Sequence, residues 1–126
     1  MAAIHKLEIS SKLIKSGAIS PELLEDIFRT VNESVSYEVE VADGITAASL
    51  PGFGSGAAAI ATIQTFIFMT DTNVTLNWNG ANTSLVVAAG NRKAVFMAYG
   101  VSTTTVPTVT NSSGQTAIIS VLAGGT

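Results

Sequence analysis

The chain has 126 residues, a length that fits one domain, and it carries a net charge of −3 with only 12% charged residues. It contains no cysteine, which excludes disulfides, a thiolate nucleophile and a Cys-based metal site. No segment is rich in Lys and Arg, and no apolar run is long enough for a membrane-spanning helix, so we expect neither nucleic acid nor a membrane as a partner.

The charged residues divide the chain into two parts. Twelve of the fifteen lie in the first 43 positions, and only Asp71, Arg92 and Lys93 lie beyond them. Such a low charge, with a mean hydropathy of +0.45, is typical of a surface that partners cover. We interpret residues 1–34 as an N-terminal arm and helix and residues 35–126 as a β-sandwich domain, with one compact domain overall.

The N-terminal part begins with an arm over residues 1–19 that fits neither a clean helix nor a clean strand. The arm either docks on a neighbour or packs on its own domain. One α-helix is predicted over 20–33, because Ser20 suits the N-cap and Pro21 the first helical position. Its apolar residues recur on one face from 23 to 31, and that face must be buried against something.

The remainder of the chain has the alternation and turn signals of short strands. Strands are predicted at 35–41, 59–70, 74–78, 84–88, 93–99, 103–110 and 116–122. Residues 59–70 are apolar on both faces, which implies cover on both sides. Asn79-Gly80 predicts a tight turn, and Pro107 suggests an edge strand. The predicted fold class is mainly β: an antiparallel β-sandwich or small barrel of about seven strands, with the N-terminal arm and the one helix.

The sequence contains few candidates for catalytic residues. The only histidine, His5, lies in the arm, so no Ser–His–acid set can be argued. Glu38 and Glu40 alternate on one strand, which is the normal way to solvate an outer face; an enzyme would need them to converge with Asp71 in a pocket. We expect no enzyme activity, no catalytic or metal-binding residue and no cofactor.

Two further patterns have a structural and a functional interpretation. The loop GFGSG, residues 52–56, lacks the Lys-Ser/Thr of a phosphate-binding loop and is favoured as a packing connector. Phe53 at its centre either anchors in a partner's pocket or folds back on the core. Trp78, Tyr37 and Tyr99 are too dispersed for a recognisable sugar or base platform.

The C-terminal part of the chain, from residue 70 on, carries a resemblance. The segments TDTNVTLNWNG (70–80), SLVVAAGNRKAVFMAYG (84–100) and VPTVTNSSGQTAIISVLAGGT (106–126) resemble the style of small tailed-bacteriophage virion structural proteins of the capsid-decoration or head-completion type. The resemblance covers about the last 60 residues and is one of pattern. It implies a β-domain without catalytic residues, which is commonly oligomeric.

Together these patterns favour a non-enzymatic virion protein, a capsid decoration or cement subunit that binds itself and the major capsid protein. Its expected location is the virion, assembled in the bacterial host cytoplasm. A neck, tail or fibre-attachment subunit is the nearest alternative, and a carbohydrate- or receptor-binding β-module is an alternative of another class. Interface residues are expected on the arm, the helix face and the Gly-rich loop, namely Leu7, Leu13, Leu24, Phe28 and Phe53.

Overall fold

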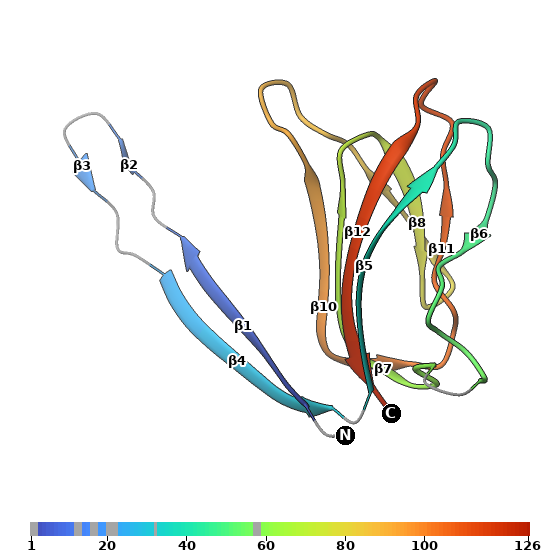
Figure 1. The fold of residues 1–126 in the computed structure, drawn as a ribbon. Coiled ribbons are helices and arrows are strands. Elements are labelled where there is room, and N and C mark those ends of the chain that lie inside the picture. Colours follow the sequence, from blue (N-terminus) through green and yellow to red (C-terminus); the bar gives the residue numbers. More distant parts are fainter. Residues whose placement is uncertain (1–2, 12–13, 16–17, 20–22, 32, 57–58) are drawn as a thin grey trace.

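The computed structural model describes residues 3–11, 14–15, 18–19, 23–31, 33–56 and 59–126. From residue 33 on, the chain forms two four-stranded sheets that stack on each other, in the orders β10-β7-β12-β5 and β6-β11-β8-β9 (Figure 1). The strands are β5 (Glu33–Val41), β6 (Ala48–Ser49), β7 (Ile63–Thr70), β8 (Val74–Trp78), β9 (Ala81–Leu85), β10 (Ala94–Thr103), β11 (Thr108–Thr110) and β12 (Ala117–Gly125). The expected antiparallel β-sandwich is confirmed, and the barrel alternative is wrong because the sheets do not close.

Side-chain alternation explains why these segments are strands. β5 pairs with β12 over nine residues, from Glu33 opposite Gly125 to Val41 opposite Ala117. Along β5 the apolar residues are half-buried or buried, and the Ser and Glu residues between them are exposed. A strand with one face toward the core and one toward solvent has this period of two.

The predicted turn at Asn79-Gly80 is confirmed. It joins β8 to β9 with Trp78 directly opposite Ala81, and both turn residues have positive φ, 52° and 80°. Two-residue hairpins with positive φ at both central positions match the twist of the flanking strands, and Asn-Gly adopts that geometry at low cost.

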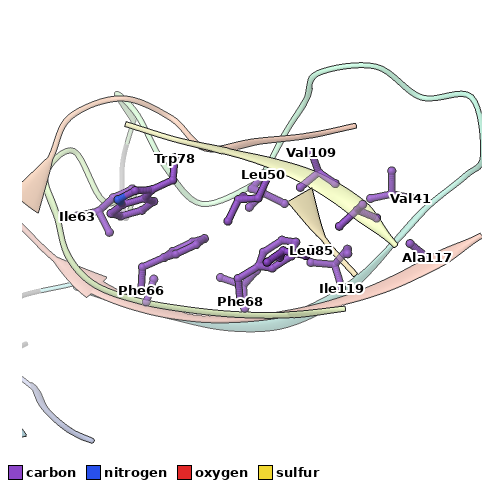
Figure 2. Close-up of a cluster of buried hydrophobic side chains, with 14 of the residues drawn as sticks. Val41, Leu50, Ile63, Phe66, Phe68, Trp78, Leu85, Val109, Ala117 and Ile119 are labelled. Carbon is purple, nitrogen blue, oxygen red and sulfur yellow. The ribbon is translucent and has the colours of Figure 1, made fainter. Parts of the chain in front are cut away.

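The core lies between the two sheets and is centred on aromatic rings (Figure 2). Phe66 of β7 is fully buried and stacks on Trp78 of β8 with ring centroids 4.6 Å apart. Phe68 lies on the same side of β7, and Phe96 of β10 approaches Phe66 edge-on. Burying rings of this size supplies much of the hydrophobic stabilisation of so small a domain.

The N-terminal part differs from the sequence-based expectation. Strand β1 (Ala3–Ser11) pairs with β4 (Leu23–Val31) as an antiparallel hairpin, and the short strands β2 (Ile14–Lys15) and β3 (Ala18–Ile19) pair near its tip. The helix predicted over 20–33 is not confirmed, since residues 23–31 form a strand and no helix occurs among the described residues. Pairing with β1 supplies backbone hydrogen bonds along this segment, and such pairing outweighs helix propensity.

Three smaller expectations also need correction. The strand predicted at 84–88 begins earlier, as β9, and a short strand that was not predicted, β6, precedes the Gly-rich loop. Pro107 does not mark an edge strand, because it precedes β11, and β11 lies between β6 and β8. A proline just outside a strand removes no ladder hydrogen bond, so the strand that follows it can be internal.

Candidate interaction surfaces

The carboxylates considered for catalysis do not converge. Glu38 and Glu40 are exposed on β5 and line two different shallow hollows. Asp71 is half-buried, and its Oδ1 accepts hydrogen bonds from the Ile118 amide at 2.8 Å and from the Thr72 hydroxyl at 2.9 Å. Asp71 therefore fixes the end of β7 against β12, which is a structural task.

Asn73, two residues after Asp71, likewise forms a hydrogen bond inside the fold. Asn73 Oδ1 accepts a hydrogen bond from the Val87 amide at 2.8 Å, which ties the loop after β7 to the segment after β9. No group of three or more His, Asp or Glu residues that could hold a metal ion is found in the part of the chain that the structure describes. The same residues contain no helix long and apolar enough to cross a bilayer.

The Gly-rich loop packs on its own domain. The Gly54 amide donates to the Ile60 carbonyl at 3.0 Å, and the Ile60 amide donates to the Gly52 carbonyl at 2.9 Å. A Cβ at Gly52, where φ is +90°, would lie 2.9 Å from a methyl group of Val35. The loop amides thus close the loop, and the glycine allows the close approach.

Phe53 folds back toward the core. Its ring meets that of Phe66 edge-on with centroids 6.0 Å apart, and the side chain is half-buried. Only part of Phe53 is therefore accessible to the partner that the sequence suggested.

The other four expected interface residues belong to the N-terminal arm. Leu7 lies opposite Ile27 in the β1–β4 hairpin, Leu24 opposite Ser10, and Phe28 opposite Lys6, while Leu13 lies outside the described residues. Figure 1 shows this hairpin standing apart from the sandwich, joined to it only where β4 leads into β5. The hairpin therefore places these three residues on one projecting element, but their contact with a partner stays a prediction.

A second surface was not predicted as an interface. The outer face of the sheet β10-β7-β12-β5 carries Val95, Met97 and Leu122, which are 49%, 48% and 39% exposed. Half-buried apolar residues lie among them, and we call the set of six the outer apolar face: Val95, Met97, Ile67, Met69, Ile118 and Leu122. The apolar pattern of residues 59–70 on both strand faces was its sequence signal, because it implied cover on two sides. Among the residues whose burial the structure describes, only the inner side is covered.

Comparisons with known proteins found no relative of this chain. No family model, no curated protein and no solved structure matches it.

Proposed function

We propose that this chain is a non-enzymatic structural subunit of a bacteriophage virion, a capsid decoration or cement protein that binds other copies of itself and the major capsid protein. The observation that carries the proposal is the hairpin β1–β4, which projects from an edge strand of the sandwich (Figure 1). A two-stranded hairpin is at best marginally stable alone in water. A neighbouring subunit that packs on it would supply the missing layer.

The body of the protein supports the same proposal. The sandwich is almost uncharged beyond residue 43, and its outer apolar face is open to solvent. Exposed apolar patches on small proteins mark interaction sites. The resemblance to small tailed-phage virion proteins falls on residues 70–126, which form strands β8 to β12, and it supports the virion as the assembly in question.

The alternative of a carbohydrate- or receptor-binding module has less support. Such a module needs aromatic rings gathered on the surface, whereas Trp78 is only 8% exposed and stacks on Phe66. Tyr37 and Tyr99 are half-buried on different strands. The described aromatic side chains thus serve mainly the core.

Copy number in purified phage particles tests the proposal. Mass spectrometry with isotope-labelled standard peptides would give the ratio of this chain to the major capsid protein. A ratio near one, or a fixed large fraction of it, is expected for a decoration or cement subunit. A dozen copies or fewer would move the protein to the neck, tail or a fibre base, and its absence would overturn the virion role.

A paired variant tests the contribution of the hairpin. Phe28→Asp places a charge on β4 and is expected to reduce incorporation into particles. Val86→Asp is the matched control, because Val86 is 64% exposed on the sandwich and lies outside both proposed surfaces. Equal incorporation of both variants would show that the hairpin does not anchor the protein.

A further inference from the structure

The register of the sheet arranges the outer apolar face in rows that cross all four strands. Ala94 of β10 lies opposite Thr70 of β7, which lies opposite Ile119 of β12, which lies opposite Val39 of β5. Continuing this register one residue beyond the start of β10 and the end of β7 places Lys93 and Asp71 in one outward row with the paired residues Ile118 and Glu40. The two outward rows that follow are Val95, Met69, Ser120 and Glu38, then Met97, Ile67, Leu122 and Ser36.

The face is uneven in both charge and height. Its β5 side carries the exposed carboxylates Glu38 and Glu40, and the β10 side begins at the exposed Arg92 and Lys93. No ion pair links these charges among the described residues, because they lie on opposite edges of the sheet. The β10 side also holds the most exposed apolar side chains, Val95 and Met97. A depression of about 410 Å³ extends from β5 across β12 to β7, and its lining includes Glu38, Leu122 and Ile67.

The area of the face fits a weak dimer. Four strands about 4.8 Å apart and three outward rows about 6.8 Å apart cover roughly 400 Å². Two such faces in contact would bury about 800 Å² in total, a size found among weak and transient protein interfaces. Sheets packed face to face are a common arrangement, so the outer face can accept another sheet as readily as the inner face does.

The two limiting orientations of a two-fold axis between stacked copies run across the strands and parallel to them. An axis across the strands puts β5 over β5, so that Glu38 and Glu40 of the two copies gather at one edge. An axis parallel to the strands puts β5 over β10, so that Glu40 of each copy faces Lys93 of the other. The hydrophobic effect follows the apolar area buried and is non-directional, so it hardly separates the two arrangements. The charges separate them, because like charges brought together at an interface are unfavourable.

We propose that two copies of this chain associate through the outer apolar face, stacked on a two-fold axis parallel to the strands, with Lys93 of each copy opposite Glu40 of the other. This inference rests on the proposed role as an assembly subunit and names the surface used for self-association. The two proposals fail separately: a monomeric protein at full copy number in particles removes only the stack, and a dimer that is absent from particles removes only the virion role.

Charge exchange between variants tests the arrangement directly. Analytical ultracentrifugation of the full chain is expected to show a dimer, with Glu40→Lys and Lys93→Glu each raising the dissociation constant at least about tenfold. Both changed side chains are exposed, so the variants are expected to fold. Mixing the two variants restores opposite charges at both facing pairs, since the lysine introduced at position 40 of one variant then meets the glutamate introduced at position 93 of the other. Native mass spectrometry with one variant isotope-labelled should therefore find heterodimers in large excess over homodimers.

Two apolar sites provide the test and its control. Met97→Glu is expected to give a monomer by placing a charge within the apolar contact, and Val86→Glu, at an exposed apolar site elsewhere on the sandwich, should leave the dimer intact. Circular dichroism verifies that each variant is folded, and Leu122→Ser replaces Met97→Glu if that variant unfolds. A monomeric wild type would overturn the inference, because the hairpin or nothing then covers the face. A dimer that survives these substitutions, or a mixture that forms no excess of heterodimer, would also overturn it.

Discussion

Asn111 is a fully buried polar residue whose replacement by Asp should destabilise the fold severely. Its Nδ2 donates hydrogen bonds to the carbonyls of Val41 at 2.9 Å and of Gln115 at 2.7 Å. Its Oδ1 accepts from the amide and the hydroxyl of Ser113, at 3.0 and 2.7 Å. The side chain thereby joins the end of β5 to the turn before β12. Replacement by Asp keeps the size of the side chain and the accepting Oδ1. It replaces the Nδ2 donor by a second oxygen, which then faces the two carbonyls.

The magnitude follows from the groups that lose a partner. The Val41 carbonyl faces the interior, and a buried acceptor without a donor costs about 1–3 kcal/mol. Gln115 is exposed, so water can replace its lost bond. A desolvated carboxylate without a compensating donor adds a penalty of at least similar size. We expect a loss of about 3–5 kcal/mol at pH 7, a large share of the roughly 5–15 kcal/mol typical of a domain.

Urea unfolding at pH 7 and pH 4, compared with wild type, measures both the loss and its cause. Desolvation should raise the folded-state pKa of the new carboxyl above its ordinary value near 4. The penalty is then smallest below that value and grows as the pH rises toward the folded pKa. Asn111→Ala should cost about 2–3 kcal/mol with no such pH dependence. An Asn111→Asp loss below 1 kcal/mol, or one equal at both pH values, would refute this account of the site.

Three further changes test the core and its boundary. Phe66→Ala removes the ring that contacts Trp78 and should cost about 3–5 kcal/mol in urea unfolding, whereas a loss below 2 kcal/mol would contradict the central role of the ring. Gly125→Ala should lower the melting temperature by several degrees, since a Cβ there would overlap the Thr62 carbonyl oxygen; an unchanged melting temperature would show that the strand can shift. The Tyr37 hydroxyl is buried without a hydrogen-bond partner, so Tyr37→Phe should stabilise by about 1 kcal/mol, and a destabilised variant would reveal a missing partner. Burial raises the pKa of Tyr37, so wild type should lose stability as the pH rises above 10, and this loss should be smaller in Tyr37→Phe.

The sandwich was predictable from local patterns. The alternation around Val74, Leu76 and Trp78 corresponds to β8 residue for residue, and Asn79-Gly80 forms the turn that this dipeptide favours. These signals depend only on neighbours in the chain. The order of the strands depends on pairings between distant segments, such as β12 between β5 and β7, and the sequence alone does not contain them.

The N-terminal segment shows where local patterns are insufficient. Residues 23–31 fit a helical face better than they alternate, because Glu25 and Arg29 fall on the same strand face as Leu23, Ile27 and Val31. The cap signals at 20–22 favoured the helix, but β1 offers a partner of equal length. A choice between the two periods needs knowledge of that pairing. The outer apolar face was missed for the same reason, since its six residues come from three strands that only the sheet order brings together.

The edge strands of the sheet β10-β7-β12-β5 carry features that disfavour pairing with another strand. The edge strand β5 carries Glu38 and Glu40, and two β5 edges placed side by side would bring these carboxylates together. The opposite edge strand, β10, has a register shift between Tyr99 and Thr103, and such irregularities disrupt further pairing. Growth of the sheet by edge addition is therefore disfavoured at both sides. The outer apolar face has no comparable feature along its centre. Association that avoids the edges and buries this face requires two copies to stack face to face, which leaves each sheet at four strands.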